Sequence, residues 1–239
     1  MSAFWDKHAK KIDPENFRAP GQYLSLDGYD YRGIVDHLET RGVRHLIALL
    51  GEDDSFGCVT EQVGGLTVSR DLLDSIVELD VLRMFDVKIA GIFLDIGAGY
   101  GRLAYRLSQL TSQYEYVITV CTDSVMVSLE ACNTYIRSRG PSVTRRTAIA
   151  LPEALPSYRP FDLAIAIHSL PEMTRIEIAW WIETLSALRV KRVFIVPHNP
   201  EWTCEGGTFR DIVDATYRQT HHWRGPDCWP RDFYLFELR

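Results

Sequence analysis

The sequence predicts an α/β fold in which a seven-stranded, mostly parallel sheet has helices on both faces and follows an N-terminal helical extension. Three observations predict this fold. From residue 91, short apolar runs alternate with amphipathic stretches, as in a parallel sheet that helices cover on both faces. A glycine-rich turn follows the first of these runs. The 239 residues, of which 46% are hydrophobic, can build a sizeable core. We expect the extension over 1–90 and the core domain over 91–239.

The extension is predicted to combine irregular chain with helices. Residues 1–30 are rich in proline, glycine and aromatic side chains and show little periodicity. Residues 31–50 have apolar side chains at helical spacing, and the acidic segment 51–57 is bounded by glycines, which indicates a loop. Ser69 is a good N-cap, with Asp71 in the first turn, for a helix that continues to about Leu82.

In the core domain the predicted strands and helices alternate along the chain. Strands are expected at 91–96, 116–121, 143–149, 161–167, 192–197, 219–223 and 233–238. Helices are expected at 102–110, at 124–138, from Thr174 to about Leu188, and near 208–218. Thr174 and Glu177 have the spacing of a capping box, in which each side chain accepts a hydrogen bond from a backbone N–H group.

Composition and charge exclude several classes of protein. The formal net charge is −6, from 26 basic and 32 acidic side chains, which argues against a nucleic-acid partner. No apolar run approaches the roughly 20 residues that span a bilayer, and the first residues lack a signal-peptide core, so we expect a cytoplasmic protein without membrane contact. Five cysteines without a CxxC pair indicate reduced thiols.

One motif carries most of the functional information. The segment from Phe93 to Arg102 reads FLDIGAGYGR: a buried strand with an acid, Asp95, near its end, then three alternating glycines, then the start of a helix. Glycines are needed where the backbone turns sharply or a ligand approaches the main chain closely. In an open α/β sheet, ligands bind outside the carboxyl ends of the strands, which is where this turn lies.

The glycine spacing separates two kinds of cofactor site. Dinucleotide sites use GxGxxG, whereas this turn is GxGxG, preceded by Asp95. The arrangement resembles motif I of the class I S-adenosylmethionine-dependent methyltransferases, which have a Rossmann-like fold with an antiparallel last strand. The resemblance implies S-adenosyl-L-methionine as cofactor, with contacts at Asp95, Gly97, Ala98, Gly99 and Gly101. A nicotinamide-dependent oxidoreductase is disfavoured by the spacing.

Two further segments are candidates for binding the cofactor. Asp123 lies 22 residues after Gly101, where an acid can hold ribose hydroxyls; it can equally be the N-cap of a helix that begins at Ser124. By analogy of position, the adenine ring would lie near Ala148 and Ile149, at the end of the third strand.

Candidate acceptor-site residues follow the fourth and fifth strands. His168 is a candidate general base, because its ordinary pKa lies near operating pH and a neutral hydroxyl needs a base to become a good nucleophile. Glu172 could orient His168, accept from the substrate or bind a metal, or it could simply precede a helix N-terminus. His198 could contact the acceptor or, with Glu201, supply metal ligands.

Other polar residues gave weaker predictions. The acidic loop Glu52, Asp53 and Asp54 could bind a metal, but we expect it to be solvated. His221 and His222 are consecutive in a predicted strand, so they point to opposite faces. These residues do not define a metal site, and a requirement for Mg²⁺ is left open.

A narrower resemblance covers roughly 69–200. The segments SRDLLDSIVELDVL (69–82), IGAGYGRLAYRL (96–107) and SLPEM (169–173) together resemble the bacterial putative sugar O-methyltransferases, some of which, in actinobacteria, methylate mannose-containing oligosaccharide precursors. The resemblance implies an acceptor-side role for Glu172 and a place in polysaccharide biosynthesis. Two departures are Pro171, where a glycine is usual, and His168, where a small polar or acidic residue is often found.

The sequence therefore predicts an O-methyltransferase that acts on a hydroxyl of a sugar by in-line displacement, with His168, Glu172 and His198 at the acceptor site. Residues 1–138 hold 20 acidic and 13 basic side chains, which favours a neutral acceptor. Two alternatives remain: a methyltransferase of another acceptor class, and an inactive methyltransferase-like binding subunit. A homodimer is left open.

Overall fold

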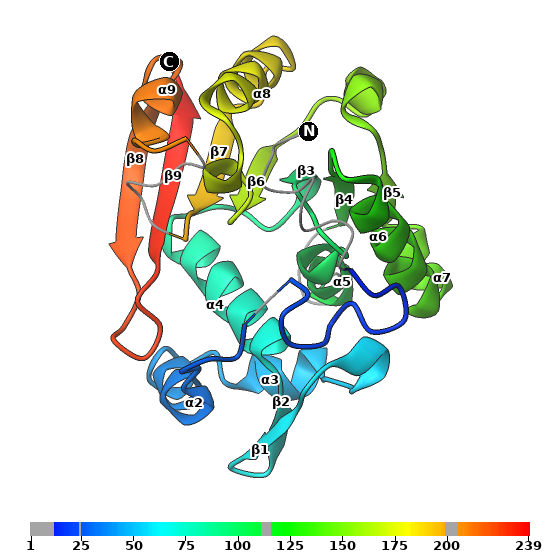
Figure 1. Ribbon diagram of the computed structural model, residues 1–239. Coiled ribbons are helices and arrows are strands. Elements are labelled where there is room, and N and C mark those ends of the chain that lie inside the picture. Colours follow the sequence, from blue (N-terminus) through cyan, green and yellow to red (C-terminus); the bar gives the residue numbers. More distant parts are fainter. Residues whose placement is uncertain (1–11, 24, 111–115, 199–204) are drawn as a thin grey trace. The chain divides into compact units, whose positions relative to one another are not determined.

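The computed structural model describes residues 12–23, 25–110, 116–198 and 205–239 (Figure 1). The chain divides into two compact units. The extension unit comprises Lys11–Lys88 and Gly225–Pro230, and the described part of the sheet unit comprises Ile89–Arg224 and Arg231–Arg239. The expected division into an extension over 1–90 and a core domain over 91–239 stays a prediction. The short segment Gly225–Pro230 was not expected to join the extension.

The sheet unit contains one seven-stranded sheet in the order β5-β4-β3-β6-β7-β9-β8 (Figure 1). Its strands are β3 (Gly91–Ile96), β4 (Val117–Thr122), β5 (Thr147–Ile149), β6 (Leu163–Ile167), β7 (Arg192–Val196), β8 (Tyr217–Arg224) and β9 (Asp232–Leu238). Strands β3 to β7 pair in parallel, and β9 is antiparallel to both β7 and β8. The predicted mostly parallel sheet with an antiparallel last strand is confirmed.

Helices pack on both faces of this sheet. On one face, alternate residues of β3, β6, β7 and β9 join buried residues of α8 (Arg175–Ala187) and α9 (Arg210–Asp214) in a single apolar cluster. On the opposite face, the thiol of Cys121 in β4 is hydrogen-bonded to that of Cys132 in α6 (Met126–Ser138). Alternation along each strand therefore gives every central strand two buried faces, as the near-continuous apolar runs predicted.

Helix starts follow the predicted capping residues. Thr174 and Glu177 form the capping box of α8, with the Glu177 carboxylate accepting from the Thr174 N–H at 2.8 Å. The Ser69 hydroxyl accepts from the Leu72 N–H and caps α4 (Arg70–Met84). Both caps satisfy backbone donors that the first turn of a helix leaves without partners.

Three predicted elements are divided or much shorter in the structure, whereas the bounds of most others differ by only one or two residues. The helix expected over 31–50 is two helices, α2 (Tyr31–Thr40) and α3 (His45–Leu50), because Gly42 adopts φ 73° and ends the first helix in a Schellman motif. The strand expected over 143–149 is only β5, since Pro141 starts the short helix α7 (Pro141–Thr144). The helix near 208–218 is only α9, because β8 already begins to pair with β9 at Tyr217.

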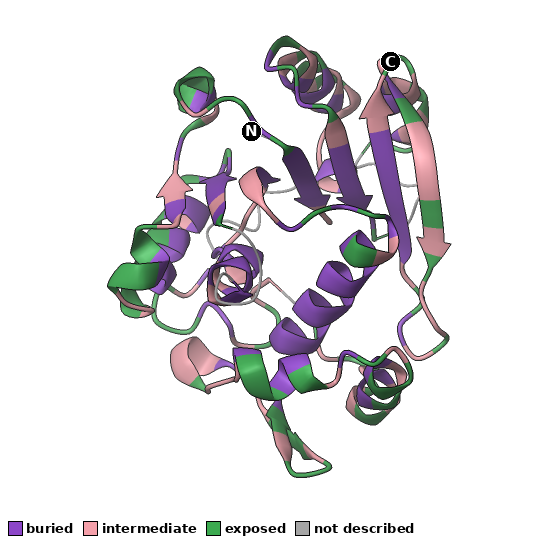
Figure 2. Cartoon of the chain, turned by 180° about the vertical axis from the view of Figure 1, so that it is seen from behind, coloured by how far each residue is buried: buried purple, intermediate pink, exposed green. Residues whose placement is uncertain are grey.

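The extension unit contains α2, α3, α4, the short 3₁₀ helix η2 (Ser55–Gly57) and a hairpin that was not predicted, β1 (Glu61–Val63) with β2 (Leu66–Val68). Helix α4 is buried over most of its length, acids included (Figure 2). No described helix is long and apolar enough to cross a membrane. Four of the five cysteines have free thiols, as expected, and Cys204 lies outside the described residues.

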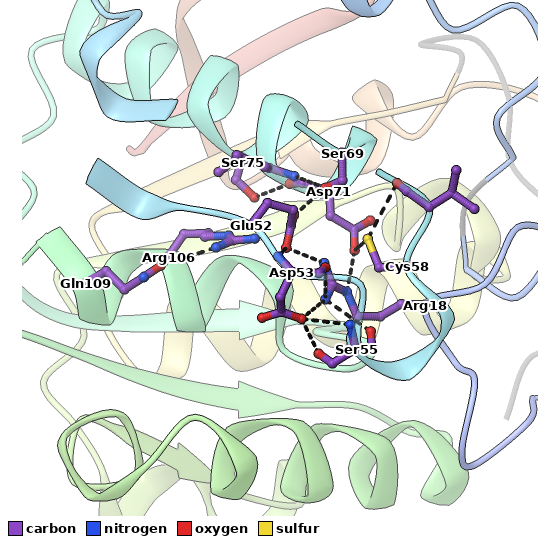
Figure 3. Close-up of polar contacts among 12 residues, drawn as sticks. Arg18, Glu52, Asp53, Ser55, Cys58, Ser69, Asp71, Ser75, Arg106 and Gln109 are labelled. Carbon is purple, nitrogen blue, oxygen red and sulfur yellow. Dashed lines mark hydrogen bonds and ion pairs between the residues drawn. The ribbon is translucent and has the colours of Figure 1, made fainter. Parts of the chain in front are cut away.

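The acidic loop of the extension is solvated in part. Asp54 is exposed and the Asp53 side chain is 41% exposed, but the Glu52 side chain is only 1% exposed. Glu52 and Asp53 contact the guanidinium of the fully buried Arg18, at 2.8 Å from Glu52 Oε1 and 3.3 Å from Asp53 Oδ1, and Asp71 Oδ2 of α4 lies 2.8 Å from the same group (Figure 3). Glu52 also accepts from the Ser69 hydroxyl. The prediction failed for Glu52 because its counter-ion lies 34 residues away in the sequence. A buried carboxylate requires such a partner.

Candidate active site

The glycine turn lies at the carboxyl end of β3, where the sequence placed it. Gly97, Gly99 and Gly101 all have positive φ, and Gly101 is the N-cap of α5 (Arg102–Gln109). At Gly97, φ is 67°, and a Cβ atom would lie 2.4 Å from the Cβ of Ser169. At Gly101, a Cβ atom would lie 2.8 Å from the sulfur of Cys132. Glycine is therefore required at both positions by conformation and by space.

The backbone donors of this turn point at the neighbouring strand. The N–H groups of Gly97 and Ala98 both donate to the carbonyl oxygen of Thr122, at 2.9 and 3.2 Å. The Gly99 N–H donates to Asp123 Oδ2 at 3.2 Å. The Asp123 carboxylate therefore already contacts one amide of the turn, and the glycine turn is joined to the end of β4 by three hydrogen bonds.

Two buried acids flank the turn. Asp95, in β3, is 5% exposed and pairs in register with Cys121. Asp123, directly after β4, is 8% exposed, and burial raises the pKa of its carboxyl to about 6, with the nearby charge of Glu172 acting in the same direction. Asp123 is not the helix N-cap, because α6 begins at Met126 and Val125 is its N-cap. It accepts instead from the Val125 N–H at 2.9 Å.

The two residues predicted to lie near the adenine ring are on the next strand. Ala148 pairs in register with Val120, and Ile149 pairs with Cys121, so both lie at the level of the last residues of β4. Both side chains are half-buried. Their place beside the end of β4 agrees with the predicted position, and their contact with a cofactor stays a prediction.

His168 follows β6 at the same edge of the sheet. Its φ is 62°, which is rare for a residue other than glycine, and its N–H donates to the Val196 carbonyl oxygen at 2.7 Å. Its ring stacks on that of His198, with the ring centroids 4.0 Å apart and the planes 26° from parallel. A strained backbone held in place by neighbouring strands is more common at functional sites than elsewhere.

Glu172 and His198 form a hydrogen-bonded pair. Glu172, the last residue of the 3₁₀ helix η5 (Leu170–Glu172), lies 3.0 Å from His198 Nε2 through its Oε1 atom. The side chains are 13% and 39% exposed, respectively. Glu172 thus contacts His198, whereas orienting His168 was only one of the roles that the sequence left open for Glu172. The three predicted acceptor-site residues do come together, as a stacked pair of imidazoles with a carboxylate on one of them.

The structure also bears on the remaining candidates. Within the described residues, no three His, Cys, Asp or Glu side chains are grouped to hold a metal ion, so Mg²⁺ has no support. Glu201 lies outside the described residues.

The two consecutive histidines of β8 have different partners. His222 contacts Asp232 Oδ1 at 2.8 Å and stacks on Tyr234, whereas His221 contacts the Thr220 hydroxyl. Pro171, unusual for the resembling family, fits the first turn of η5.

Sequence reasoning missed one residue of this site. Ser169 is 8% exposed, and its hydroxyl donates to the Ile96 carbonyl oxygen at 2.6 Å, so it joins the end of β6 to the glycine turn. The two residues are 73 positions apart in the chain. The one signal in the sequence is the position of Ser169 directly after a predicted strand, which places it at the same edge of the sheet as the glycine turn.

Comparison with known proteins places this arrangement among the methyltransferases by fold. The chain is similar to the glycopeptide N-methyltransferase MtfA (TM-score 0.56, 11% identity, 70% of this chain and 91% of MtfA covered). It is also similar to a SAM-dependent methyltransferase from Aquifex aeolicus (TM-score 0.52, 16% identity, 67% and 89% covered). A third similar structure is the mitomycin 7-O-methyltransferase MmcR (TM-score 0.50, 14% identity, 70% and 57% covered).

These likenesses show the fold. The sheet unit has the Rossmann-like fold of the S-adenosylmethionine-dependent methyltransferases, as the glycine turn predicted. The chain spans little more than half the length of MmcR. No protein-family model and no curated protein sequence matches the chain.

Proposed function

We propose that this protein is an S-adenosylmethionine-dependent O-methyltransferase that methylates a hydroxyl group of a sugar or a similar small, uncharged acceptor. One observation carries the proposal: the glycine turn and the cluster of His168, His198 and Glu172 lie at the same edge of one sheet, connected by the Ser169 hydrogen bond. In α/β folds this edge is where ligands bind. A cofactor site and a candidate base therefore adjoin each other.

The residues of the turn suit S-adenosylmethionine. Asp95 and Asp123 would hold the ammonium group and the ribose hydroxyls, and Gly97 to Gly101 would let the main chain approach the cofactor closely. The sulfonium group supplies an activated methyl when the cofactor is bound. Support comes from the spacing of the glycines, GxGxG after Asp95, which differs from the GxGxxG of dinucleotide sites. One structural neighbour, MtfA, was solved with S-adenosyl-L-homocysteine.

The acceptor cluster supports transfer to oxygen. A neutral hydroxyl must lose its proton as it attacks, and His168 is the proposed base. Its ring is fixed by stacking on His198, and the hydrogen bond to Glu172 fixes His198 in turn. The fold alone does not choose the acceptor atom, since MtfA is an N-methyltransferase and MmcR an O-methyltransferase. The uncharged acceptor rests on the acidic balance of residues 1–138.

An activity screen tests the proposal. Labelled S-adenosylmethionine is incubated with free and partly methylated mono- and disaccharides, with and without Mg²⁺. We expect label transfer to a saccharide at equal rates in both conditions, because the described residues do not group three metal ligands. Label found only on protein or nucleic acid would contradict the acceptor class. Calorimetric binding of S-adenosylhomocysteine with no turnover on any acceptor would instead support an inactive binding subunit.

A further inference from the structure

We propose that Ser169 is a positioning residue that connects the cofactor turn to the candidate base. The inference rests on the proposed function and adds a role for a residue outside the predicted site. Ser169 lies between two functional segments: it directly follows His168, and its hydroxyl donates to the carbonyl oxygen of Ile96, the residue before Gly97. A shift of the β6 end relative to the turn would break this 2.6 Å hydrogen bond.

The hydrogen bond from Ser169 to Ile96 takes the place of a helix-capping hydrogen bond. Ser169 occupies the N-cap position of η5, where a serine hydroxyl usually accepts from a backbone N–H of the first turn. Here the hydroxyl makes no cap hydrogen bond, and it reaches across to β3 instead. A serine kept for helix capping would be expected to bond locally. The cross-strand bond indicates that the hydroxyl fixes two strand ends to each other.

Steric contact reinforces this connection. The Cα atom of Gly97 packs so closely on Ser169 that a Cβ atom would lie 2.4 Å from the serine Cβ and 3.1 Å from its hydroxyl oxygen. The Ser169 side chain therefore packs directly against Gly97 of the turn. The next residue, Leu170, is buried in the apolar cluster of the sheet. The backbone of Ser169 is thus restricted by both contacts.

His168 is held from the other side by the neighbouring strand. Its N–H donates to Val196 of β7, and its ring stacks on His198, which follows β7. The left-handed backbone of His168 thus lies between an anchor on β3, through Ser169, and an anchor on β7. Correct alignment of a base with a reacting centre requires positional control of well under 1 Å, which a doubly anchored residue can supply.

The test compares Ser169→Ala with the matched variant Ser108→Ala. Ser108 is also buried, and its hydroxyl also donates to a backbone carbonyl, that of Tyr105, at 2.6 Å, but it lies within α5. For Ser169→Ala we expect kcat to fall about tenfold or more, with the dissociation constant of S-adenosylhomocysteine changed less than about threefold, because the turn keeps its bonds to Thr122 and Asp123. Ser108→Ala should change neither, and Ser169→Thr, which restores a hydroxyl, should recover part of kcat.

A double-mutant cycle asks whether Ser169 acts through His168. In the His168→Ala background, Ser169→Ala should have almost no further effect on kcat. Full additivity of the two losses would overturn the proposal. A second readout does not depend on turnover: in histidine-labelled protein, Ser169→Ala should shift the NMR signals of the His168 ring, and Ser108→Ala should leave them in place. Unchanged His168 signals in Ser169→Ala would overturn the positioning role whether or not the protein methylates a sugar.

Discussion

The protein contains two polar clusters that differ in how completely they are enclosed. In the extension unit, Arg18 is fully buried, and its guanidinium contacts three carboxylates from segments 34 to 53 residues away (Figure 3). In the sheet unit, His168, His198 and Glu172 lie at a strand edge, and 39% of the His198 side chain and 13% of the Glu172 side chain are exposed. In the first cluster the Arg18 side chain is completely enclosed, although the Asp53 side chain is 41% exposed, whereas in the second cluster the imidazole of His198 itself is exposed to solvent.

The difference separates a stabilising cluster from a chemical one. Removing a buried arginine leaves its carboxylate partners, above all the buried Glu52 and Asp71, without a counter-ion, which destabilises the native chain. A histidine pair that is partly exposed can meet a substrate, and its neighbours fix its geometry. We therefore expect variants of the first cluster to lower the free energy of unfolding, and variants of the second to lower turnover.

The largest effect on stability is expected for Arg18→Met. The variant leaves Glu52, Asp53 and Asp71 without the guanidinium, which should cost about 3–5 kcal/mol in the free energy of unfolding. Urea denaturation measures it. The matched control is Arg175→Met, since the Arg175–Asp211 pair is largely exposed (39% and 54%) and its loss should leave the free energy of unfolding almost unchanged. Equal losses in the two variants would remove the distinction between the clusters.

The largest effect on turnover is expected for His168→Ala. Loss of a general base typically lowers the rate by about 10²–10⁴-fold, so kcat should fall by at least about 100-fold while S-adenosylhomocysteine still binds. His222→Ala is the control, because His222 also lies beside a carboxylate, that of Asp232, but on β8. A kcat near that of the wild type in His168→Ala would show that the base is another residue.

An intermediate effect is expected for Asp123→Asn, and it depends on pH. Burial raises the pKa of the Asp123 carboxyl to about 6, above the roughly 3.9 of an unfolded aspartate. The folded protein therefore binds the proton more tightly, and this contribution to stability is complete below about pH 4 and is lost as pH rises through 6. Relative to Asp123→Asn, the wild type should lose on the order of 3 kcal/mol across that interval. Parallel pH profiles of the two proteins in urea denaturation would contradict the raised pKa.

The smallest effect on turnover is expected for Glu172→Gln. The amide keeps the size of the side chain and one hydrogen bond to His198 but removes the charge, so kcat should fall only about tenfold. Steady-state kinetics with saturating cofactor measure it. Glu183→Gln, in α8, offers a control acid without a place in the site. A loss as large as that of His168→Ala would make the carboxylate, and not the imidazole pair, the principal group.

The sequence predicted most of the sheet and the cofactor turn because both depend on local patterns. Apolar runs, a capping box at Thr174 and three alternating glycines are each visible within a few residues. The same reasoning placed Asp123 near the turn, but of the two roles that it left open, the helix N-cap is wrong, since α6 begins at Met126 with Val125 as its N-cap. The gathering of His168, Glu172 and His198 followed from the rule that parallel strands end at one edge.

The parts that the sequence did not predict depend on distant pairs of residues. Arg18 and its acids are separated by loops and a hairpin, so no window of sequence contains both charges. The bond from Ser169 to Ile96 spans 73 residues. The hydrogen bond of Glu172 to His198 was not among the roles that the sequence left open for Glu172, because the sequence gives the strand order only by analogy and the path after β7 not at all. Pairings of this kind become visible only in three dimensions.

The most direct test of the central claim is calorimetric titration of S-adenosylhomocysteine into three proteins: the wild type, Gly97→Ala and Gly140→Ala. Both glycines have positive φ, but an added Cβ atom meets Ser169 at Gly97 and nothing within 4 Å at Gly140. We predict binding to the wild type and to Gly140→Ala, and loss of binding in Gly97→Ala. Absence of binding to the wild type, or undiminished binding to Gly97→Ala, would contradict the assignment of the glycine turn as the cofactor site.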